Sequence, residues 1–570
     1  MGDEHISATK RPDFSVDEHR PMKVICIGAG FAGIAAGIRF RQRVPNLDLT
    51  IYEKEDGVGG VWHANKYPGL GCDILSHAYQ YSFEENTQWS SFYSPGPEIK
   101  AYLEGVVAKY KLIPYIRLRH ELVSARWNEG TAKWTVRIRR LTDGHEFTDS
   151  SDVLFLGVGG LSRWHWPDLD GLKSFRGTLV HSADWRVTDE TLESWKNKNV
   201  AVIGNGSTGV QLVPALQPRV KTLTNFIHGK AWLTMQLSVD KMLALVGKEP
   251  GTLDYSFDED FKKKLEDPVY YRRFRHEVEA AMHGLGPVYI KGSPTQAVVR
   301  DLVEKEMIKK LSRKPELIGK VLPNFPVGCR RISPGPGYLD ALCEDNVTLE
   351  TTHIAHVTET GVELVDGRQV ALDVMVCATG FDTTWLYPFP VIGRDGQALT
   401  DRWAAHAEAY LTVAVDGFPN LWFCSGPNSG LTSGSAIATI EKQVDYAVAA
   451  VVKMQRERLR SMEVKREALR DFNEWARDYF KKTVYAENCS SWYLSPNDGV
   501  LTGLWPGSCL HFIHVLSRPR WEDFDYERLA EDRSQNKFYW LGDGLTYAEK
   551  TMTGDRAWYL NDVDIPPVPQ

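Results

Sequence analysis

Two glycine-rich segments have the residue types and spacing that hold the pyrophosphate of a dinucleotide. Each follows an apolar run with the pattern GxGxxG, whose glycines are Gly28, Gly30 and Gly33 in the first segment and Gly204, Gly206 and Gly209 in the second. The first glycine permits a tight turn, the second lets the backbone approach the pyrophosphate, and the third lets a helix pack on a strand. One such pattern is a weak signal, whereas two in a strand–turn–helix context predict two dinucleotide sites.

The residues about twenty positions after each pattern indicate which nucleotide it binds. Glu53 ends a strand-like run where a carboxylate can accept both ribose hydroxyls of an adenosine, the alternative being a solvated glutamate. The second segment has His228 and Lys230 there instead, and a cation suits the 2′-phosphate of NADPH. The alternative is a surface histidine and lysine in a loop, and histidine is mostly neutral at pH 7.

The simplest electron path places FAD on the first segment and NADPH on the second, with hydride passing between them. None of the eight cysteines lies within four residues of another, which excludes a local dithiol of the disulfide-reductase kind. The sequence also has no His/Cys/Asp/Glu cluster with metal-ligand spacing, so we predict no metal. Dioxygen is then the expected electron acceptor. We expect most cysteines to be buried, reduced thiols, as in a reducing cytosol.

Two longer motifs resemble the flavin-dependent Baeyer–Villiger monooxygenases, or class B flavoprotein monooxygenases. The first, FxGxxxHxxxW, is present as Phe175, Gly177, His181 and Trp185, with Arg186 where the family usually has Pro or Asp. The second runs from Gly59 to Asp73 and includes Gly60, Val61, Trp62, Tyr67, Pro68 and Gly69. The segment around Asn488, Trp492 and Trp505 looks like members that act on fungal polyketide and terpenoid intermediates. The resemblance covers roughly residues 22–545.

The resemblance implies an oxygen insertion next to a ketone carbonyl through a flavin peroxide. By position, Arg331 corresponds to the catalytic cation that stabilises the peroxide anion and the developing oxyanion, and Asp73 would pair with it. Arg330 stands where the family usually has a lysine that contacts the NADPH 2′-phosphate, and arginine keeps that charge. The alternatives are surface arginines and, for Asp73, a turn cap.

Further cofactor contacts are implied by position in the same motifs. The resemblance places Trp62 and Tyr79 along the flavin and Trp492 at a cofactor ribose, whereas as isolated residues they would be assigned to packing. It gives His181 a structural role in the interdomain linker. The remaining predicted cofactor-binding residues lie in the same segments and are Phe31, Ala32, Val61, Asn205, Ser207, Thr208 and Gln211.

These residues require an α/β fold with two Rossmann-like dinucleotide-binding domains, one for FAD and one for NADP. Strand-like runs that end in glycine bracket the second domain, so we expect the first to be discontinuous. The predicted parts are a flexible arm (1–21), the first part of the FAD-binding domain (22–165), the NADP-binding domain (166–374) with a helical insertion (236–325), the second part of the FAD-binding domain (375–545) and a C-terminal tail (546–570).

The composition is that of a globular chain of 570 residues with a net charge of −7. Nucleic-acid-binding proteins are usually basic, so we expect no such partner. No apolar stretch reaches the ~18 residues of a membrane span, so we expect no transmembrane segment. The polar N-terminus is unlike a secretory signal, and we expect a cytoplasmic enzyme. The sequence does not predict an oligomeric state.

The leading hypothesis is an FAD- and NADPH-dependent Baeyer–Villiger monooxygenase that converts a bulky polyketide or terpenoid ketone of secondary metabolism with O2. The intact first motif and Arg331 favour it over an N- or S-oxygenating flavin monooxygenase with the same cofactors. A non-catalytic nucleotide-binding protein is the third hypothesis. The complete set of phosphate glycines argues against this one.

Overall fold

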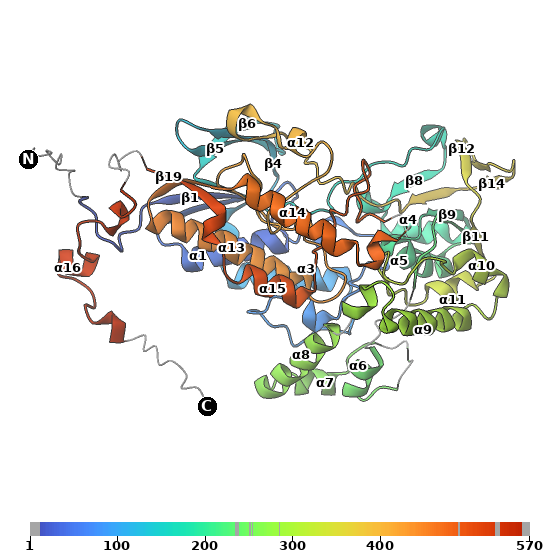
Figure 1. Ribbon diagram of the computed structural model, residues 1–570. Helices are drawn as coiled ribbons and strands as arrows, with labels where there is room; N and C mark the ends of the chain where they lie inside the picture. The colour runs from blue at the N-terminus through green and yellow to red at the C-terminus, as the bar shows by residue number, and fades with distance from the viewer. Residues whose placement is uncertain are drawn as a thin grey trace, which may run out of the picture.

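The computed structural model describes residues 12–233, 239–249, 252, 255–283, 286–487, 489, 491–529 and 536–560. Two five-stranded parallel sheets lie in different parts of the molecule, and helices cover them (Figure 1). The ends of the predicted arm and tail, 1–11 and 561–570, and parts of the predicted insertion lie outside the described residues.

The first sheet has the strand order β17-β7-β1-β2-β3, with all neighbours parallel. Its strands are β1 (Met22–Ile27), β2 (Leu47–Tyr52), β3 (Ile116–Arg117), β7 (Val153–Leu156) and β17 (Leu421–Phe423). The central strand β1 is almost entirely buried, as expected for a parallel sheet that is covered on both faces. Because β17 comes from a distant part of the chain, two separate stretches build this sheet.

The second sheet has the order β11-β10-β9-β15-β8, again with all neighbours parallel. Its strands are β8 (Thr178–His181), β9 (Asn199–Ile203), β10 (Thr222–Phe226), β11 (Val347–Glu350) and β15 (Val374–Cys377). β15 spans position 375, where we expected the second FAD part to begin, and pairs with β8 and β9. This strand therefore belongs to the second sheet.

The helices that follow the two fingerprints begin directly at the glycine turns. α1 (Phe31–Arg43) has Gly30 as its N-cap and packs on the long helix α13 (Ala436–Arg456), and α5 (Ser207–Leu216) has Gly206 as its N-cap. The other helices outside the insertion are α2 (Val61–Ala64), α3 (Gly96–Lys109), α4 (Asp189–Glu193), α11 (Tyr338–Leu342), α12 (Leu399–Arg402), α14 (Arg466–Phe480), α15 (Cys509–Leu516) and α16 (Tyr547–Thr551).

The remaining strands form three smaller sheets. A four-stranded sheet consists of β4 (His120–Asn128), β5 (Lys133–Arg140), β6 (Glu146–Ser151) and β16 (Val391–Ile392). A three-stranded sheet consists of β12 (Ile354–Thr358), β13 (Gly361–Leu364) and β14 (Gln369–Ala371). An antiparallel pair consists of β18 (Leu459–Val464) and β19 (Phe524–Arg528).

Helices fill the described part of the predicted insertion, and they pack on both cores. Its helices are α6 (Val239–Leu245), α7 (Glu259–Lys264), α8 (Pro268–Met282), α9 (Pro294–Lys310) and α10 (Ile318–Val321). Phe261 and Phe274 of α7 and α8 belong to the core of the first sheet, whereas Val303 and Met307 of α9 belong to that of the second. The insertion therefore bridges the two nucleotide domains.

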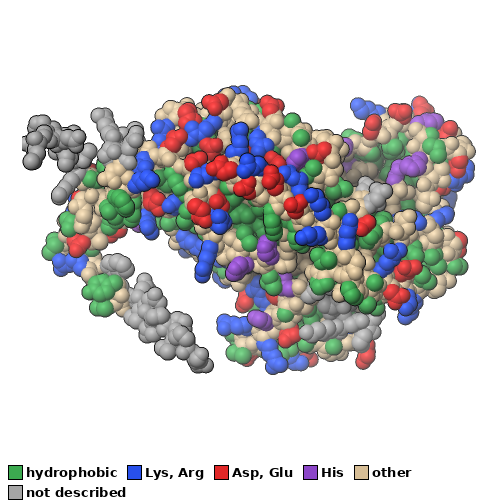
Figure 2. All heavy atoms as spheres, in the orientation of Figure 1, with side chains coloured by type: hydrophobic (Ala, Val, Ile, Leu, Met, Phe, Trp, Pro, Cys, Tyr) green, Lys and Arg blue, Asp and Glu red, His purple; other side chains and the backbone are tan. Residues whose placement is uncertain are grey.

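The described part of the N-terminal arm packs against the C-terminal segment. The Val16 N–H donates to the carbonyl of Leu545 at 3.1 Å, and the Asp543 N–H donates to that of Phe14 at 2.9 Å. α16 lies beside this arm, away from the second sheet (Figure 1). No helix of the described ranges has both the length and the apolar composition to cross a membrane. Figure 2 shows basic side chains mixed with acidic ones over one face.

Candidate active site

The first fingerprint forms the turn between β1 and α1. The Gly28 N–H donates to the carbonyl of Tyr52 at 2.8 Å, which holds the turn against the end of β2. Gly28 has a φ of +99°, and a Cβ there would lie 2.6 Å from the carbonyl oxygen of Gly157, so glycine is required. Gly30 is the N-cap of α1, so the first N–H groups of this helix face the place that a pyrophosphate would take.

The second sequence motif lies directly on this turn. The Gly59 N–H donates to the carbonyl of Ala29 at 2.9 Å, and the Cα of Gly60 is 3.4 Å from where a Cβ on Gly30 would stand. Two glycine backbones thus face each other and leave a space that side chains would fill. This cradle fits the phosphates of the predicted FAD.

Glu53 follows β2 beside the same turn. It is only 5% exposed, so it is not the solvated strand-end glutamate of the alternative interpretation. Its Oε2 accepts the N–H of Ala29 at 2.7 Å, and its Oε1 accepts that of Glu55 at 2.9 Å. Burial raises the pKa of Glu53, and these two donors oppose that rise. The carboxylate lies at the end of β2 next to the phosphate turn, where a ribose contact would form.

Tyr79 brings the predicted flavin-side aromatic residues together. Trp62 donates from Nε1 to the Tyr79 Oη at 3.2 Å, and the ring of Phe31 lies edge-on to Tyr79 at 5.3 Å. Burial raises the pKa of Tyr79, so this hydroxyl stays neutral. Ala32 is buried in the first turn of α1, whereas Val61, at the start of α2, is 37% exposed.

Arg331 and Asp73 form an ion pair between the two nucleotide domains. Arg331 donates from Nε to Oδ2 at 3.0 Å and from Nη2 to Oδ1 at 2.6 Å, which is a bidentate pair. The Asp73 carboxylate raises the pKa of Arg331 above its usual value, so the guanidinium stays positive. The two side chains are 33% and 20% exposed, which leaves them accessible to a ligand. Asp73 thus contacts the partner that the resemblance implies.

A cavity of about 630 Å³ lies beside this pair. Its lining includes Trp62, Tyr67, Leu70, Asp73, Gln211 and Pro334. The Tyr67 Oη donates to the Gln211 Oε1 at 2.8 Å, and the Gln211 Nε2 donates to the carbonyl of Gly71 at 2.9 Å. Burial raises the pKa of Tyr67 to about 12. Gln211 therefore links α5 to the second motif at the cavity wall.

The second fingerprint forms the corresponding turn between β9 and α5. Apart from its chain neighbours, no described atom lies within 4 Å of a Cβ built on Gly206, the N-cap of α5. This open space fits the approach of a pyrophosphate. The Asn205 Nδ2 donates to the carbonyl of Gly229 at 2.6 Å, which joins the turn to the loop after β10. The other predicted residues of this turn, Ser207 and Thr208, begin α5.

Cationic side chains gather beyond β10, where the NADPH 2′-phosphate is predicted. Arg330 donates from Nη1 to the carbonyl of Lys230 at 3.0 Å. Its buried Nε has no hydrogen-bond partner among the described residues, which suits a donor to an anion. Burial, and secondly His353, lower the pKa of His228, so the histidine is neutral at pH 7. Arg330 and Lys230, rather than His228, thus carry the charge at this site.

Trp492 lies on the C-terminal segment beside the Arg331 loop. It is 39% exposed and packs edge-on against Tyr493 at 4.7 Å. Tyr493 is 1% exposed and interacts electrostatically with Arg331. Sequence reasoning missed Tyr493, and its place directly after Trp492 was the only available signal. Contact between Trp492 and a cofactor ribose stays a prediction.

His181 of the first motif joins the end of β8 to the crossing after β15. Its Nδ1 accepts the N–H of Ala183 at 3.2 Å, so its Nε2 donates to the Thr379 Oγ1, also at 3.2 Å. The ring stacks on Trp164 at 4.3 Å. Burial lowers the pKa of His181 to about 4, so the imidazole is neutral. These contacts fit the structural role that the resemblance implies.

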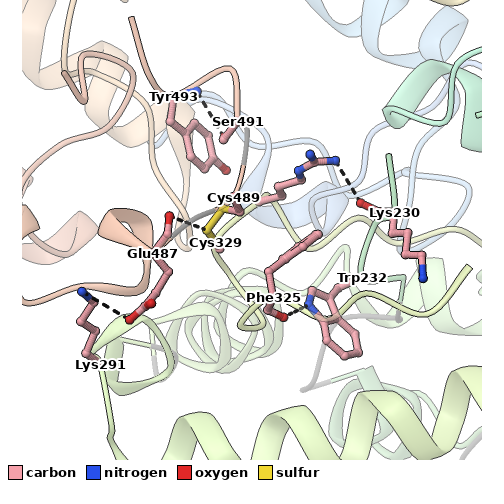
Figure 3. Close-up of a disulfide and its surroundings, with 10 residues drawn as sticks. Lys230, Trp232, Lys291, Phe325, Cys329, Glu487, Cys489, Ser491 and Tyr493 are labelled. Atoms are coloured by element: carbon pink, nitrogen blue, oxygen red, sulfur yellow. Dashed lines mark hydrogen bonds and ion pairs between the residues drawn. A yellow bond between two sulfur atoms is a disulfide. The ribbon is translucent and has the colours of Figure 1, made fainter. Parts of the chain in front are cut away.

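Cys329 and Cys489, which are 160 positions apart, are joined by a disulfide (Figure 3). The spacing of the cysteines excluded only a dithiol between residues close in the sequence. The fold brings these two distant cysteines together, which spacing rules cannot detect. The reduced state that we expected for most cysteines applies to the other six, which are Cys26, Cys72, Cys343, Cys377, Cys424 and Cys509, all buried.

Comparison with known proteins places this geometry in a family. Residues 22–248 match the pyridine nucleotide-disulphide oxidoreductase family. The chain is 38% identical over 547 residues to the FAD-binding monooxygenase tazF of Aspergillus terreus, with 95% of each chain covered. It is 34% identical over 496 residues to a Baeyer–Villiger monooxygenase of Pseudomonas aeruginosa, covering 86% of this chain and 89% of that one.

Solved structures of similar proteins have the same fold. Cyclohexanone monooxygenase from Rhodococcus sp. Phi1, bound to NADP+, is 26% identical, with a TM-score of 0.73 over 90% of this chain and 100% of that chain. An oxidized steroid monooxygenase bound to NADP is 27% identical, with the same TM-score and coverage.

Proposed function

This chain belongs to the FAD-binding monooxygenases, the family that includes the Baeyer–Villiger monooxygenases, and we propose that it inserts one oxygen atom next to a ketone carbonyl to give an ester or lactone. The enzyme is a flavin monooxygenase with FAD and NADP as cofactors. FAD, when bound, supplies hydride acceptance and the activation of dioxygen. The protein must bind both cofactors, hold the ketone and stabilise developing negative charge.

The Arg331–Asp73 pair carries this proposal. The ketone oxygen becomes negative when its carbonyl is attacked, and a fixed guanidinium stabilises that charge without reorganising. Asp73 takes the Nε and Nη2 donors of Arg331, so Nη1 lies outside the pair and can donate to an oxygen in the site. Trp62 and Tyr67 line the adjacent cavity, where they would restrict water.

The proposed substrate is a bulky polyketide or terpenoid ketone of secondary metabolism. A cavity of about 630 Å³ has the size of a typical small-molecule site, and the resemblance of the C-terminal segment to fungal enzymes of that kind supports the choice. We propose NADPH rather than NADH because Arg330 and Lys230 supply positive charge beyond β10. We also propose a cytoplasmic location, which the six buried free thiols support.

Product identification by mass spectrometry tests the proposed reaction. The purified enzyme is incubated with FAD, NADPH, O2 and a panel of polyketide and terpenoid ketones. We expect a product 16 Da heavier whose fragmentation gives an ester or lactone. Oxidation of amines or sulfides with no ketone converted would instead favour a heteroatom monooxygenase. Protein that stays colourless after FAD is added would favour a non-catalytic nucleotide-binding protein.

A further inference from the structure

The Cys329–Cys489 disulfide connects the loop that carries both site arginines to the C-terminal segment (Figure 3). Arg330 and Arg331 follow Cys329 directly, and Trp492 follows Cys489 by three positions. A residue spans at most about 3.6 Å, so the Cα of Arg331 lies within ~7 Å of that of Cys329. The bond therefore restrains predicted cofactor-side residues on both segments at once.

Buried contacts flank the disulfide on each side. Cys329 is 1% and Cys489 7% exposed. The Tyr289 ring lies 2.8 Å from where a Cβ on Gly328 would stand, and it stacks on Tyr485 at 5.7 Å. Beyond Arg331, the guanidinium is held by Asp73 at 2.6 and 3.0 Å. The arginine loop is thus fixed through its backbone at Cys329 and through its side chain at Asp73.

The other six cysteines are free thiols. All six are buried, and desolvation raises the pKa of the Cys26, Cys72 and Cys424 thiols well above the usual value. A thiol that stays protonated is a weak nucleophile. Disulfides in a reducing compartment are usually transient and regulatory. Among the eight cysteines, Cys329 and Cys489 are the two that a disulfide joins, and Cys329 directly precedes the two arginines of the site.

On the basis of the proposed function, we propose that Cys329 and Cys489 form a reversible redox-modification site whose disulfide holds Arg331 in position against Asp73. Opening the disulfide releases the arginine loop, so NADPH oxidation continues while oxygen insertion fails. Arg331 would act on the substrate, whereas the two cysteines act through Arg331 and are positioning residues. The same disulfide links the segments that carry Arg330, predicted to contact the NADPH 2′-phosphate, and Trp492, predicted to contact a cofactor ribose.

The redox step needs hydrogen peroxide as oxidant and a dithiol as reductant. For oxidation, one cysteine thiol loses its proton and its thiolate attacks an oxygen of hydrogen peroxide. The O–O bond breaks, the sulfur becomes a sulfenic acid, and the leaving oxygen takes up the proton and departs as water. The second thiol then displaces the sulfenic hydroxyl as water, and the S–S bond forms. For reduction, a dithiol attacks the more exposed Cys489 sulfur, the S–S bond breaks, and the dithiol leaves as its own disulfide.

The test compares the oxidised and reduced holoenzyme after small reagents are removed. Hydrogen peroxide prepares the oxidised form, and a phosphine followed by desalting prepares the reduced one. Alkylation under denaturing conditions should label the six free cysteines in the first form and all eight in the second. Hydrogen exchange of residues 325–333 should be faster in the eight-thiol form. Ester formed per NADPH oxidised should fall roughly tenfold and recover on reoxidation.

Matched variants distinguish the effect of the disulfide from a general loss of structure. Cys489→Ser should give the ester yield per NADPH of the reduced enzyme, and neither hydrogen peroxide nor the phosphine should change that yield. Cys343→Ser removes a buried free cysteine of the second core and should respond to both reagents as the wild type does. If Cys489→Ser does not fold, the reversible change in the wild type still decides the matter.

Three results would overturn the proposal. They are eight thiols after peroxide treatment, equal hydrogen exchange in the two forms, and equal ester yield per NADPH in an enzyme that converts a ketone. If neither form converts any ketone, the proposed function fails. Hydrogen exchange of residues 325–333 alone then decides whether the disulfide restrains the arginine loop.

Discussion

Arg330 and Arg331 are adjacent but hold different positions in the site. Arg331 donates to the Asp73 carboxylate, whereas Arg330 donates to the carbonyl of Lys230, just beyond β10 in the second nucleotide domain. One short loop thus supplies two cationic groups with separate partners. The two arginines can therefore be tested independently, one against NADPH and one against oxygen insertion.

Replacing Arg330 should weaken NADPH binding without stopping the chemistry. A charge-assisted hydrogen bond to phosphate contributes about 1.5–3 kcal/mol, so Arg330→Ala should raise the KM for NADPH by roughly tenfold or more and leave kcat near wild type. Steady-state kinetics with NADPH and NADH measure this. NADH lacks the 2′-phosphate, so its KM should not change, and Arg330→Lys should recover most of the loss. An equal rise in KM for both nucleotides would contradict the assignment.

At the residue scale, motif positions were readable from the sequence, but partners were not. The spacing around Asp73 and Arg331 indicated both residues through a family resemblance, and the structure joins them across 258 positions. Glu53 was predicted as a ribose ligand, and its burial could not be read from a strand end. Cys329 and Cys489 were not paired, because distant cysteines meet only through the tertiary fold.

At the scale of elements, the glycines of the strand–turn–helix unit at Gly204–Gly209 serve different purposes, one for folding and one for binding. A Cβ on Gly209 would lie 2.3 Å from the carbonyl oxygen of Gly204, so its glycine is needed for the helix to pack. A Cβ on Gly206 would meet no described atom within 4 Å beyond its chain neighbours. Packing within the protein therefore requires glycine at position 209, whereas we predict that glycine at position 206 is needed for the approach of the pyrophosphate.

The two alanine variants should therefore fail differently. Gly209→Ala should lower the free energy of unfolding by about 2 kcal/mol, because the helix must shift away from the turn. Gly206→Ala should leave the free energy of unfolding within about 0.5 kcal/mol of wild type and raise the KM for NADPH roughly tenfold. Denaturant unfolding and steady-state kinetics measure the pair. Equal destabilisation by both variants would contradict the distinction.

His77 connects the insertion to the segment that follows Asp73. It is 0% exposed, and its ring lies 5.4 Å from Phe257 and 5.1 Å from Phe274. Neither ring nitrogen has a hydrogen-bond partner among the described residues. Burial lowers the pKa of His77 from 6.5 to about 3, so this histidine is neutral in the folded protein.

The pH dependence of stability should carry the signature of His77. The unfolded chain binds a proton at this histidine below pH ~6.5, while the folded protein does so only near pH 3. Stability is therefore lost as pH falls from about 6.5, by about 3 kcal/mol at pH 4. His77→Leu should flatten this part of the curve, measured by denaturant unfolding between pH 7.5 and 4. The exposed His145→Leu is the control, and an unchanged slope in His77→Leu would contradict the account.

For the insertion, the sequence predicted the helices but not the core on which each helix packs. Its helices were expected from charged, helix-periodic sequence, and they are present. The sequence assigned the whole insertion to the second nucleotide domain, but α7 and α8 pack on the core of the first. Residues such as Phe261 and Phe274 indicate a buried face without indicating which sheet covers it.

At the scale of the whole molecule, the candidate active site lies where the two nucleotide domains meet. The Arg331–Asp73 pair and the Gln211–Gly71 hydrogen bond both connect the second domain to the motif on the first. The net charge of −7 describes a surface of mixed signs, which hides the cations of the site (Figure 2). The proposed function depends on charges placed where the two domains meet, and neither length nor composition predicts this placement.

The central claim is that Arg331 serves oxygen insertion rather than cofactor reduction. A single-turnover measurement on Arg331→Ala tests this claim most directly. Flavin colour is followed after NADPH is added, and the product is analysed after O2 is added. We expect flavin reduction within roughly tenfold of the wild-type rate and loss of ester by a factor of 10² or more, since one electrostatic donor contributes about that much. Normal ester formation by this variant would contradict the account.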